Sequence, residues 1–279
     1  MRFIAKQISI LLAIIGITTL QAEEKPLWEA GIGMAGLNFP NYRGSKHQQN
    51  YLLPLPYFIY RGKWLKVSRD GLRGLFYQSP RMSLDISLDG GMPSRSDDNT
   101  VREGMPDLDP IFEIGPSLKI LLAQNRDRTR KLNLKLPIRT AVATDMTHFQ
   151  NIGWLFAPQI ALESIIGAEQ RWRVKLAAET RYASQDYHDF YYGVAPKYTT
   201  LTRMTYSAKS GYSGTRLTAS LSWLLMKNLR LATFLRYDNL HHTVFDDSPL
   251  LEKEHSLMAG FAIAWIFARS KHQVTVTNH

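Results

Sequence analysis

Hydrophobic and polar residues alternate one by one along most of this chain. The segment 81–89 reads Arg-Met-Ser-Leu-Asp-Ile-Ser-Leu-Asp, so that every second residue is apolar. The segments 130–144 and 214–226 repeat the pattern. Side chains of a β-strand point to opposite faces with a period of two, whereas a helix repeats at about 3.6 residues. The alternation therefore predicts strands that have one apolar and one polar face.

Twelve segments carry this pattern and are predicted to be strands. They are 27–37, 51–61, 64–77, 81–89, 110–122, 130–144, 152–164, 170–182, 200–209, 214–226, 229–239 and 256–267. Strands of soluble sandwiches usually have about 5–6 residues, whereas a tilted strand needs about 9–11 to cross a bilayer. Most of these segments have the longer length, and aromatic residues lie near their ends on the apolar face, as in the interfacial girdles of outer-membrane barrels.

The length and facing of these segments predict an all-β fold, a transmembrane antiparallel β-barrel of the outer membrane with about twelve strands. A periplasmic sandwich or a lipocalin-like barrel is the alternative. Such membrane barrels have short periplasmic turns and long external loops. The long connections 38–50, 90–109, 183–199 and 240–255 do not all fall on one side of twelve consecutive strands. The segment 64–77, which is interrupted by Arg69-Asp70-Gly71, can also be read as two short strands.

The first 22 residues have the composition of a secretory signal peptide. Arg2 and Lys6 flank the start of an apolar run, and Ala22 supplies a small residue at the cleavage point. The run is shorter than the roughly 20 residues of a membrane-spanning helix; an N-terminal anchor is the alternative. We predict a signal peptide at 1–22, a barrel at 23–267 and a polar C-terminal tail at 268–279, which we expect to be disordered in the periplasm.

Composition and charge narrow the possible functions. The chain has 279 residues, no cysteine, and 34 Lys and Arg against 24 Asp and Glu. The lack of cysteine excludes disulfide scaffolds and thiolate metal sites. A basic balance is compatible with nucleic acid, but export favours anionic envelope lipids or polymers as the counter-charge. Neither G-x-S-x-G nor H-E-x-x-H occurs, so we predict no enzyme, no cofactor and no metal site.

The polar faces of two predicted strands are strongly basic. The residues predicted to line the lumen are Lys135, Arg139, Arg171, Arg173, Lys175, Glu179 and Arg181. A basic lumen favours anions. The alternative is a lumen filled by side chains, because a barrel of about twelve strands lies between the filled and the open sizes.

One long loop is rich in acidic residues. Asp97, Asp98, Asp107 and Asp109 can bind Ca²⁺ or form ion pairs with basic residues of the same loop, namely Arg95 and Arg102. The spacing does not match an EF-hand, because it lacks the loop glycine and the closing Glu of that motif. An internally paired, solvated loop is therefore the favoured interpretation.

Seven short motifs follow one another along the chain. They are Pro40-Asn41-Tyr42-Arg43-Gly44-Ser45, Pro54-Leu55-Pro56-Tyr57, Gly71-Leu72-Arg73-Gly74, the acidic loop 95–109, Glu113-Ile114-Gly115-Pro116, Tyr191-Tyr192-Gly193-Val194 and Asp247-Ser248-Pro249-Leu250. In this order the set resembles the MipA/OmpV family of outer-membrane proteins over about 27–267. The loop residues that carry the resemblance are Tyr42, Gly44, Ser45, Asp97, Asp98, Gly104, Asp107, Asp109, Ser248 and Pro249.

The resemblance implies a place in the outer membrane of a Gram-negative cell, in contact with its lipid. It also implies a scaffold role in murein synthesis, between a lytic transglycosylase and a penicillin-binding protein. Other members of the family resemble porins or adhesins, so an anion-preferring channel and an adhesin are the alternatives. The resemblance brings no catalytic residue to this chain.

Overall fold

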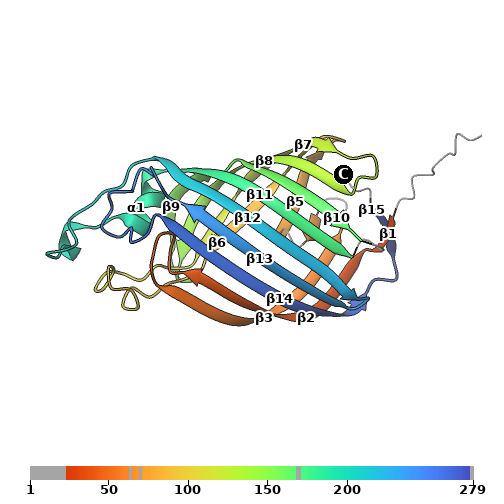
Figure 1. The fold of residues 1–279 in the computed structure, drawn as a ribbon, viewed down its shortest axis with the longest axis horizontal. Helices are drawn as coiled ribbons and strands as arrows, with labels where there is room; N and C mark the ends of the chain where they lie inside the picture. The colour runs from red at the N-terminus through yellow and green to blue at the C-terminus, as the bar shows by residue number, and fades with distance from the viewer. Residues whose placement is uncertain (1–22, 63–64, 69–70, 168–170, 277–279) are drawn as a thin grey trace, which may run out of the picture.

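The chain folds into one closed antiparallel β-barrel (Figure 1), which confirms the predicted fold class. The computed structural model describes residues 23–276 except 63–64, 69–70 and 168–170. The last strand of the wall, β14 (His255–Arg269), pairs with the first, β2 (Trp28–Pro40), and closes the ring. The other wall strands are β3 (Gln48–Arg61), β4 (Leu65–Ser68), β5 (Gly71–Gln78), β6 (Met82–Gly91), β7 (Ile111–Gln124), β8 (Arg130–Thr144), β9 (Phe149–Phe156), β10 (Gln159–Ile166), β11 (Trp172–Ala183), β12 (Gly211–Met226) and β13 (Leu229–Asn239).

The wall has twelve strands, although thirteen segments are paired in it. β9 and β10 lie end to end, because β9 pairs with the second half of β8 and β10 with its first half. Pro158 lies between β9 and β10, and a proline has no N–H to donate to a neighbouring strand. The two segments are therefore halves of one strand, the one predicted over 152–164.

Two predicted strands differ from the observed wall, and the differences cancel in the count. The segment 64–77 forms two short strands, β4 and β5. The prediction of a strand over 200–209 is wrong, because these residues belong to the loop 184–210. In that loop the guanidinium of Arg203 donates to three backbone carbonyl oxygens. The segment 200–209 has the alternation of a strand, but loop contacts and not a neighbouring strand hold it in place.

With these corrections the connections separate by length. The four longest, 41–47, 92–110, 184–210 and 240–254, all lie at one end of the barrel, on the left in Figure 1. The other end carries short turns, of which Lys227-Asn228 is one. Outer-membrane barrels have their long loops outside the cell and their short turns in the periplasm. The end with the long connections is therefore extracellular, and the predicted conflict is resolved.

The segments that flank the wall form a small sheet at the periplasmic end. β1 (Glu23–Pro26) pairs antiparallel with β15 (Gln273–Val276). The prediction of a disordered tail after Phe267 is therefore wrong for these residues, and β14 itself continues to Arg269. The predicted signal peptide, 1–22, lies outside the described residues.

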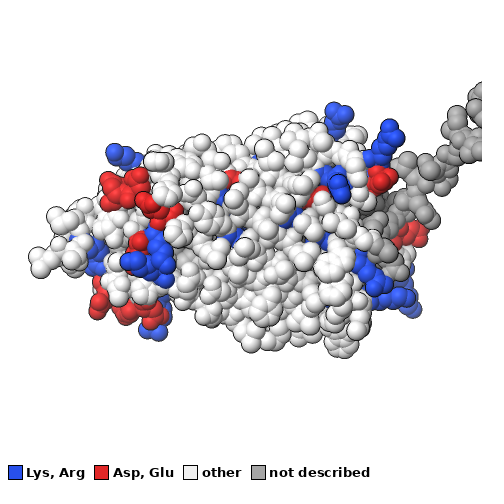
Figure 2. Space-filling model, viewed as in Figure 1, with Lys and Arg blue, Asp and Glu red and all other residues white. Residues whose placement is uncertain are grey.

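The outer face of the wall is apolar. Leu176, Leu217 and Phe261 expose 49%, 51% and 61% of their surface. Figure 2 shows most charged side chains at the two ends of the barrel and few on the wall between them. Near the periplasmic end, Trp172 and Trp223 stack with their ring centroids 4.5 Å apart. An apolar band bordered by aromatic rings is the surface that contacts lipid in an outer-membrane barrel.

Within the part of the chain that the structure describes, β3 has a second strand partner only near its periplasmic end. It pairs with β2 from end to end, but among the described residues it pairs with β4 only at Tyr60 and Arg61. Pro54 and Pro56 lie in the part without a second partner. Proline lacks the N–H that an inner strand donates on both sides, so prolines in sheets are confined to edges and bulges. The Pro54-Leu55-Pro56 motif thus fits a part of β3 that pairs on one side only among the described residues.

Leu176→Arg is expected to destabilise the barrel by about 2–4 kcal/mol, because a charge on the lipid face costs that amount near the bilayer midplane. Leu176 lies on this face between the aromatic rings of Trp172 and Tyr182. Ser220 lies at the same height on the lumen face of β12, so Ser220→Arg should cost clearly less. Urea unfolding of the refolded variants measures both values. Equal losses would contradict the assigned facing.

Candidate functional site

The extracellular mouth of the barrel is covered by its four longest connections, which together we call the lid. Loop 184–210 carries the helix α1 (Gln185–Tyr192), and the side chain of Ser184 caps its first turn by accepting from Tyr187 N–H. Tyr187 packs into an apolar cluster with Ile152 and Leu155 of β9. Among the described residues, no helix is long and apolar enough to cross a membrane. α1 instead fills the mouth.

Residues of the family motifs join three loops of the lid. The Tyr42 hydroxyl donates to the carbonyl oxygen of Leu250 at 2.6 Å. Ser248 Oγ donates to the carbonyl oxygen of Tyr192 at 2.8 Å, and the Tyr192 hydroxyl donates to that of Arg43 at 2.8 Å. Loops 41–47, 184–210 and 240–254 are thereby held together. Most of these contacts use backbone oxygens, so they depend on loop shape more than on the partner's side chain.

Gly44 lies where loop 41–47 meets loop 240–254. Its φ of +88° is in the left-handed region that favours glycine, and a Cβ at this position would collide with Leu251. Its N–H donates to Ser256 Oγ at 2.6 Å. The next residue, Ser45, accepts from Asn99 Nδ2 at 3.0 Å and so connects loop 92–110 to the other loops.

The remaining motif residues contribute less to the contacts between the loops of the lid. Gly104 has a φ of +74° and makes a turn in loop 92–110. Pro249 is partly buried beside Ser248, and Asp97 is exposed. Asp98 and Asp109 line a cavity at the edge of the lid.

The acidic residues of loop 92–110 do not form the predicted ion pairs with Arg95 and Arg102 within the described part of the chain. Arg102 is buried and donates to the carbonyl oxygens of Tyr191 at 3.0 Å and of Pro106 at 3.1 Å. Burial lowers the pKa of its guanidinium. Asp107 accepts from Ser96 N–H at 2.7 Å. In the described ranges, no group of three or more His, Asp and Glu is placed to hold a metal.

Below the lid, charged side chains from six strands and one loop form a continuous row, which we call the charge belt. Acidic and basic groups alternate along it. The nitrogen–oxygen contacts are Asp89–Arg139 at 2.8 Å, Arg139–Glu113 at 2.9 Å, Glu113–Arg181 at 3.8 Å, Arg181–Glu179 at 2.9 Å, Glu179–Arg216 at 3.9 Å, Arg216–Asp238 at 2.9 Å and Asp238–Arg43 at 3.2 Å. Each arginine thus contacts at least one carboxylate, and the belt carries no net formal charge.

The lid and the charge belt are directly connected. The hydroxyl of Tyr187, on α1, donates to Glu113 Oε1 at 2.8 Å. Burial raises the pKa of Tyr187 to about 12, so the hydroxyl keeps its proton and acts as a donor at neutral pH. Arg43, at the end of the belt, belongs to loop 41–47 and donates to Ser213 Oγ at 3.2 Å.

The predicted lumen residues divide into three groups. Arg139, Glu179 and Arg181 belong to the charge belt. On the same face of β8 and β11, nearer the periplasm, lie Lys135, Arg173 and Lys175. Arg171 precedes β11 and is exposed. The three predicted residues in the belt are balanced by acids on β6, β7 and β13, which a count over two strands does not include.

His188 is a buried histidine on the inner side of α1. It is fully buried, and its ring centroid lies 4.9 Å from that of Phe245. Its Nδ1 lies 2.6 Å from the carbonyl oxygen of Lys209. Burial lowers the pKa of His188 to about 4, and the positive charge of Arg43 acts in the same direction. The imidazole is therefore neutral at pH 7 and donates to Lys209.

The barrel, the lid and the motif contacts lie within one stretch that a family model recognises. The model of the MltA-interacting protein MipA matches residues 32–267. This chain belongs to the MipA family. The match spans nearly the whole wall and the complete lid, and it confirms the resemblance seen in the motifs. No curated protein matches the chain in sequence.

Solved structures of outer-membrane proteins resemble this MipA-family chain in general architecture. A bacterial polysaccharide outer membrane secretin is 8% identical with a TM-score of 0.45, and the match covers 86% of this chain and 99% of that one. The NanC porin is 7% identical with a TM-score of 0.43, covering 84% and 98%. Outer membrane phospholipase A from Escherichia coli is 9% identical with a TM-score of 0.33, covering 85% and 92%. Similarity at this level says nothing about activity.

Acidification is expected to loosen the lid through His188. The pKa of about 4 in the folded protein lies below the ordinary value of 6.5, so protons bind more strongly to the unfolded chain. The stability that this group contributes is complete above about pH 6.5 and is lost as the pH falls towards 4, by about 3 kcal/mol in all. His188→Gln should lose this pH dependence, measured by limited proteolysis of the lid.

The control for this prediction is His242→Asn. His242 is exposed and has a φ of 58°, which asparagine tolerates. This variant should keep the pH dependence of the parent chain. A parent lid that is equally resistant to protease at pH 7 and pH 4 would contradict the role of His188.

Arg139→Met is expected to destabilise the barrel by about 3–5 kcal/mol, because it leaves buried carboxylates without their partner. The most affected group is Glu113, which is 4% exposed and lies 2.9 Å from Arg139. The double variant Arg139→Met with Glu113→Gln should recover part of the loss, since it removes the unpaired charge. Urea midpoints measure all three proteins. A double variant less stable than Arg139→Met would show that the pairing is not the cause.

Proposed function

We propose that this chain is a non-enzymatic scaffold of the outer membrane that binds murein-synthesis proteins, namely a lytic transglycosylase and a penicillin-binding protein. The observation that carries the proposal is the filled mouth of the barrel, together with membership in the family of the MltA-interacting protein. α1 and the charge belt occupy the space that a wide pore needs. With the lumen occupied in this way, the two ends of the barrel remain available to bind other proteins.

The periplasmic end supports this proposal, because it offers a charged surface where murein enzymes are reached. Among the described residues, the exposed Lys and Arg there are Arg81, Arg126, Arg130, Arg171, Lys227, Arg269 and Lys271, against the exposed acidic residues Glu24 and Asp127. Blue side chains stand out at this end, on the right in Figure 2. Complementary charge steers partners and sets specificity, so we infer that the partner presents an acidic face.

The composition of the charge belt also favours a function without catalysis. A general acid or base needs a group that exchanges protons near neutral pH. The belt consists of arginines and carboxylates, and each arginine contacts at least one carboxylate. Tyr187 keeps its proton because of burial. We therefore assign no reaction to this site.

An anion-preferring channel is the second candidate. Lys135, Arg173 and Lys175 on the periplasmic part of the lumen face favour it, because a row of cations attracts anions. In this case the lid would have to move for ions to pass. An adhesin, the third possibility, would act through the exposed loops of the lid.

Charge reversal at the periplasmic end tests the scaffold. The double variant Lys227→Glu and Lys271→Glu is expected to reduce co-purification of a lytic transglycosylase several-fold, with the loss most evident at low salt. Lys197→Glu, an exposed lysine of the lid, is the matched control and should bind normally. The mass of the purified protein also tests the predicted removal of residues 1–22.

Planar-bilayer recording separates the two candidates. The scaffold predicts silent or rare openings of the purified protein. Steady, anion-selective steps that decrease in Arg173→Gln would favour the channel. Co-purification that is unchanged by charge reversal at either end would count against the assigned binding surface.

A further inference from the structure

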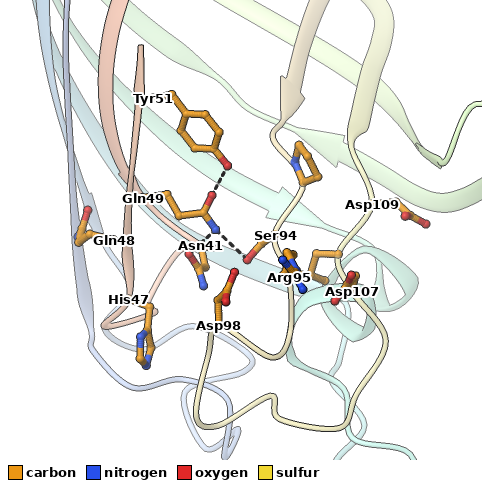
Figure 3. Close-up of a pocket in the computed structure, with 12 residues that line it drawn as sticks. Asn41, His47, Gln48, Gln49, Tyr51, Ser94, Arg95, Asp98, Asp107 and Asp109 are labelled. Atoms are coloured by element: carbon orange, nitrogen blue, oxygen red, sulfur yellow. Dashed lines mark hydrogen bonds between the residues drawn. The ribbon is translucent and has the colours of Figure 1, made fainter. Parts of the chain in front are cut away.

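A polar cavity lies between the extracellular end of β3 and loop 92–110 (Figure 3). Its volume is about 550 Å³, within the range of about 300–1,000 Å³ that is usual for small-molecule sites. It lies along the part of β3 that has β2 as its strand partner. The lining residues that the structure describes do not include any member of the charge belt.

The walls of this cavity are fixed by contacts of their own. The two arms of loop 92–110 are joined by a pair of hydrogen bonds, from Ser94 N–H to the oxygen of Leu108 at 2.9 Å and from Leu108 N–H to that of Ser94 at 2.8 Å. On β3, the ring of Tyr51 stacks on Phe39 with the centroids 5.2 Å apart. A site that is held in shape loses little conformational entropy when a ligand binds.

One buried donor in the cavity has no partner. Asn41 is 7% exposed, and its Nδ2 forms no hydrogen bond within the described residues. Its Oδ1 accepts from Gln49 Nε2 at 2.7 Å, and Gln49 Oε1 accepts from the Tyr51 hydroxyl (Figure 3). Buried polar groups in proteins are nearly always hydrogen-bonded. The Nδ2 group is therefore a donor that remains available to a molecule bound in the cavity.

The acceptors of the cavity are mainly carboxylates. Asp98, Asp107 and Asp109 line it, with Arg95 as the single lining residue of permanent positive charge among those described. Asp107 is engaged by Ser96 N–H, whereas Asp98 has no hydrogen bond or ion pair within the described residues. Figure 3 shows the Asp98 carboxylate turned towards Asn41. A suitable ligand donates to Asp98, accepts from Asn41 and carries no negative charge.

We propose that this cavity binds a neutral, hydroxyl-rich molecule of the sugar class. A hydroxyl group is a donor and an acceptor at once, so the hydroxyls of one sugar supply both a donor for Asp98 and an acceptor for Asn41. Hydrogen bonds to an ionised carboxylate are about twice as strong as those between neutral groups. The carboxylates repel an acidic sugar. The cavity is on the extracellular side, where such molecules arrive from outside the cell.

Saturation-transfer NMR on the full chain tests this site, in a detergent whose headgroup is not a sugar. The probes are glucose and galactose, each compared with its acidic counterpart, glucuronate or galacturonate. We expect at least one neutral sugar to bind with a millimolar or lower Kd. The Kd of its acidic counterpart should be at least about tenfold higher. No binding of either neutral sugar in the millimolar range, or equal binding of the acidic counterparts, would overturn the proposal.

Two neighbouring carboxylates provide a matched pair of variants. Asp97 and Asp98 are both exposed on loop 92–110, but only Asp98 lines the cavity. Asp98→Asn is expected to weaken sugar binding about tenfold, through loss of a charge-assisted hydrogen bond, and Asp97→Asn should leave it unchanged. Asn41→Asp keeps the acceptor for Gln49, removes the free donor and should also weaken binding. Unchanged affinity in Asp98→Asn would overturn the proposal even if Asn41→Asp fails to fold.

Discussion

Charges enclosed in a narrow lumen are stable only as a paired set, and this constraint determines how the barrel is organised. Arg181 is 2% exposed and Glu113 is 4% exposed, so neither side chain is freely hydrated. A buried ion without its partner costs several kcal/mol. The alternating belt avoids this cost by combining residues from six strands with Arg43 from the lid. A shift of any one of these strands by one residue would turn its charged groups towards lipid, so the belt and the lipid face together specify the register.

The apolar half of this arrangement is visible in the sequence, because it is local. Alternation along a single strand identifies its lipid face without reference to any other strand, and Leu176 between Trp172 and Tyr182 is an example. Where local chemistry interrupts the pattern, the interruption is also visible, as at Pro158 and at Arg69-Asp70-Gly71. The segment 200–209 has the same alternation, but Arg203 binds carbonyl oxygens of loops. Period alone does not distinguish a strand from a loop that is held by tertiary contacts.

The polar half is not local, and this is why the sequence predicted it only in part. The lumen position of Arg139 and Arg181 follows from alternation, but each also pairs with a carboxylate that is distant in the chain, 50 residues away for Asp89 and 68 for Glu113. Counting β8 and β11 alone gives an excess of positive charge, whereas the charge belt balances once Asp89, Glu113 and Asp238 are counted with it. That Asn41 and Asp98, both of them motif residues, meet in one cavity was not predicted for a similar reason. Asn41 and Asp98 are far apart in the chain, and an unpartnered amide has no signature in the sequence.

The contacts within the lid explain the presence of some motif residues but not of others. Tyr42, Gly44, Ser45 and Ser248 hold loops to one another, mostly through backbone atoms, so their presence needs no external partner. Asp107 is likewise engaged by Ser96. Asp98 differs, because it belongs to the same motif and has no hydrogen bond or ion pair to another described residue. A polar residue without a partner in the fold is more informative about binding than one that already holds two loops together. For this reason Asp98 and the free amide of Asn41 indicate a binding site and not only a structural loop.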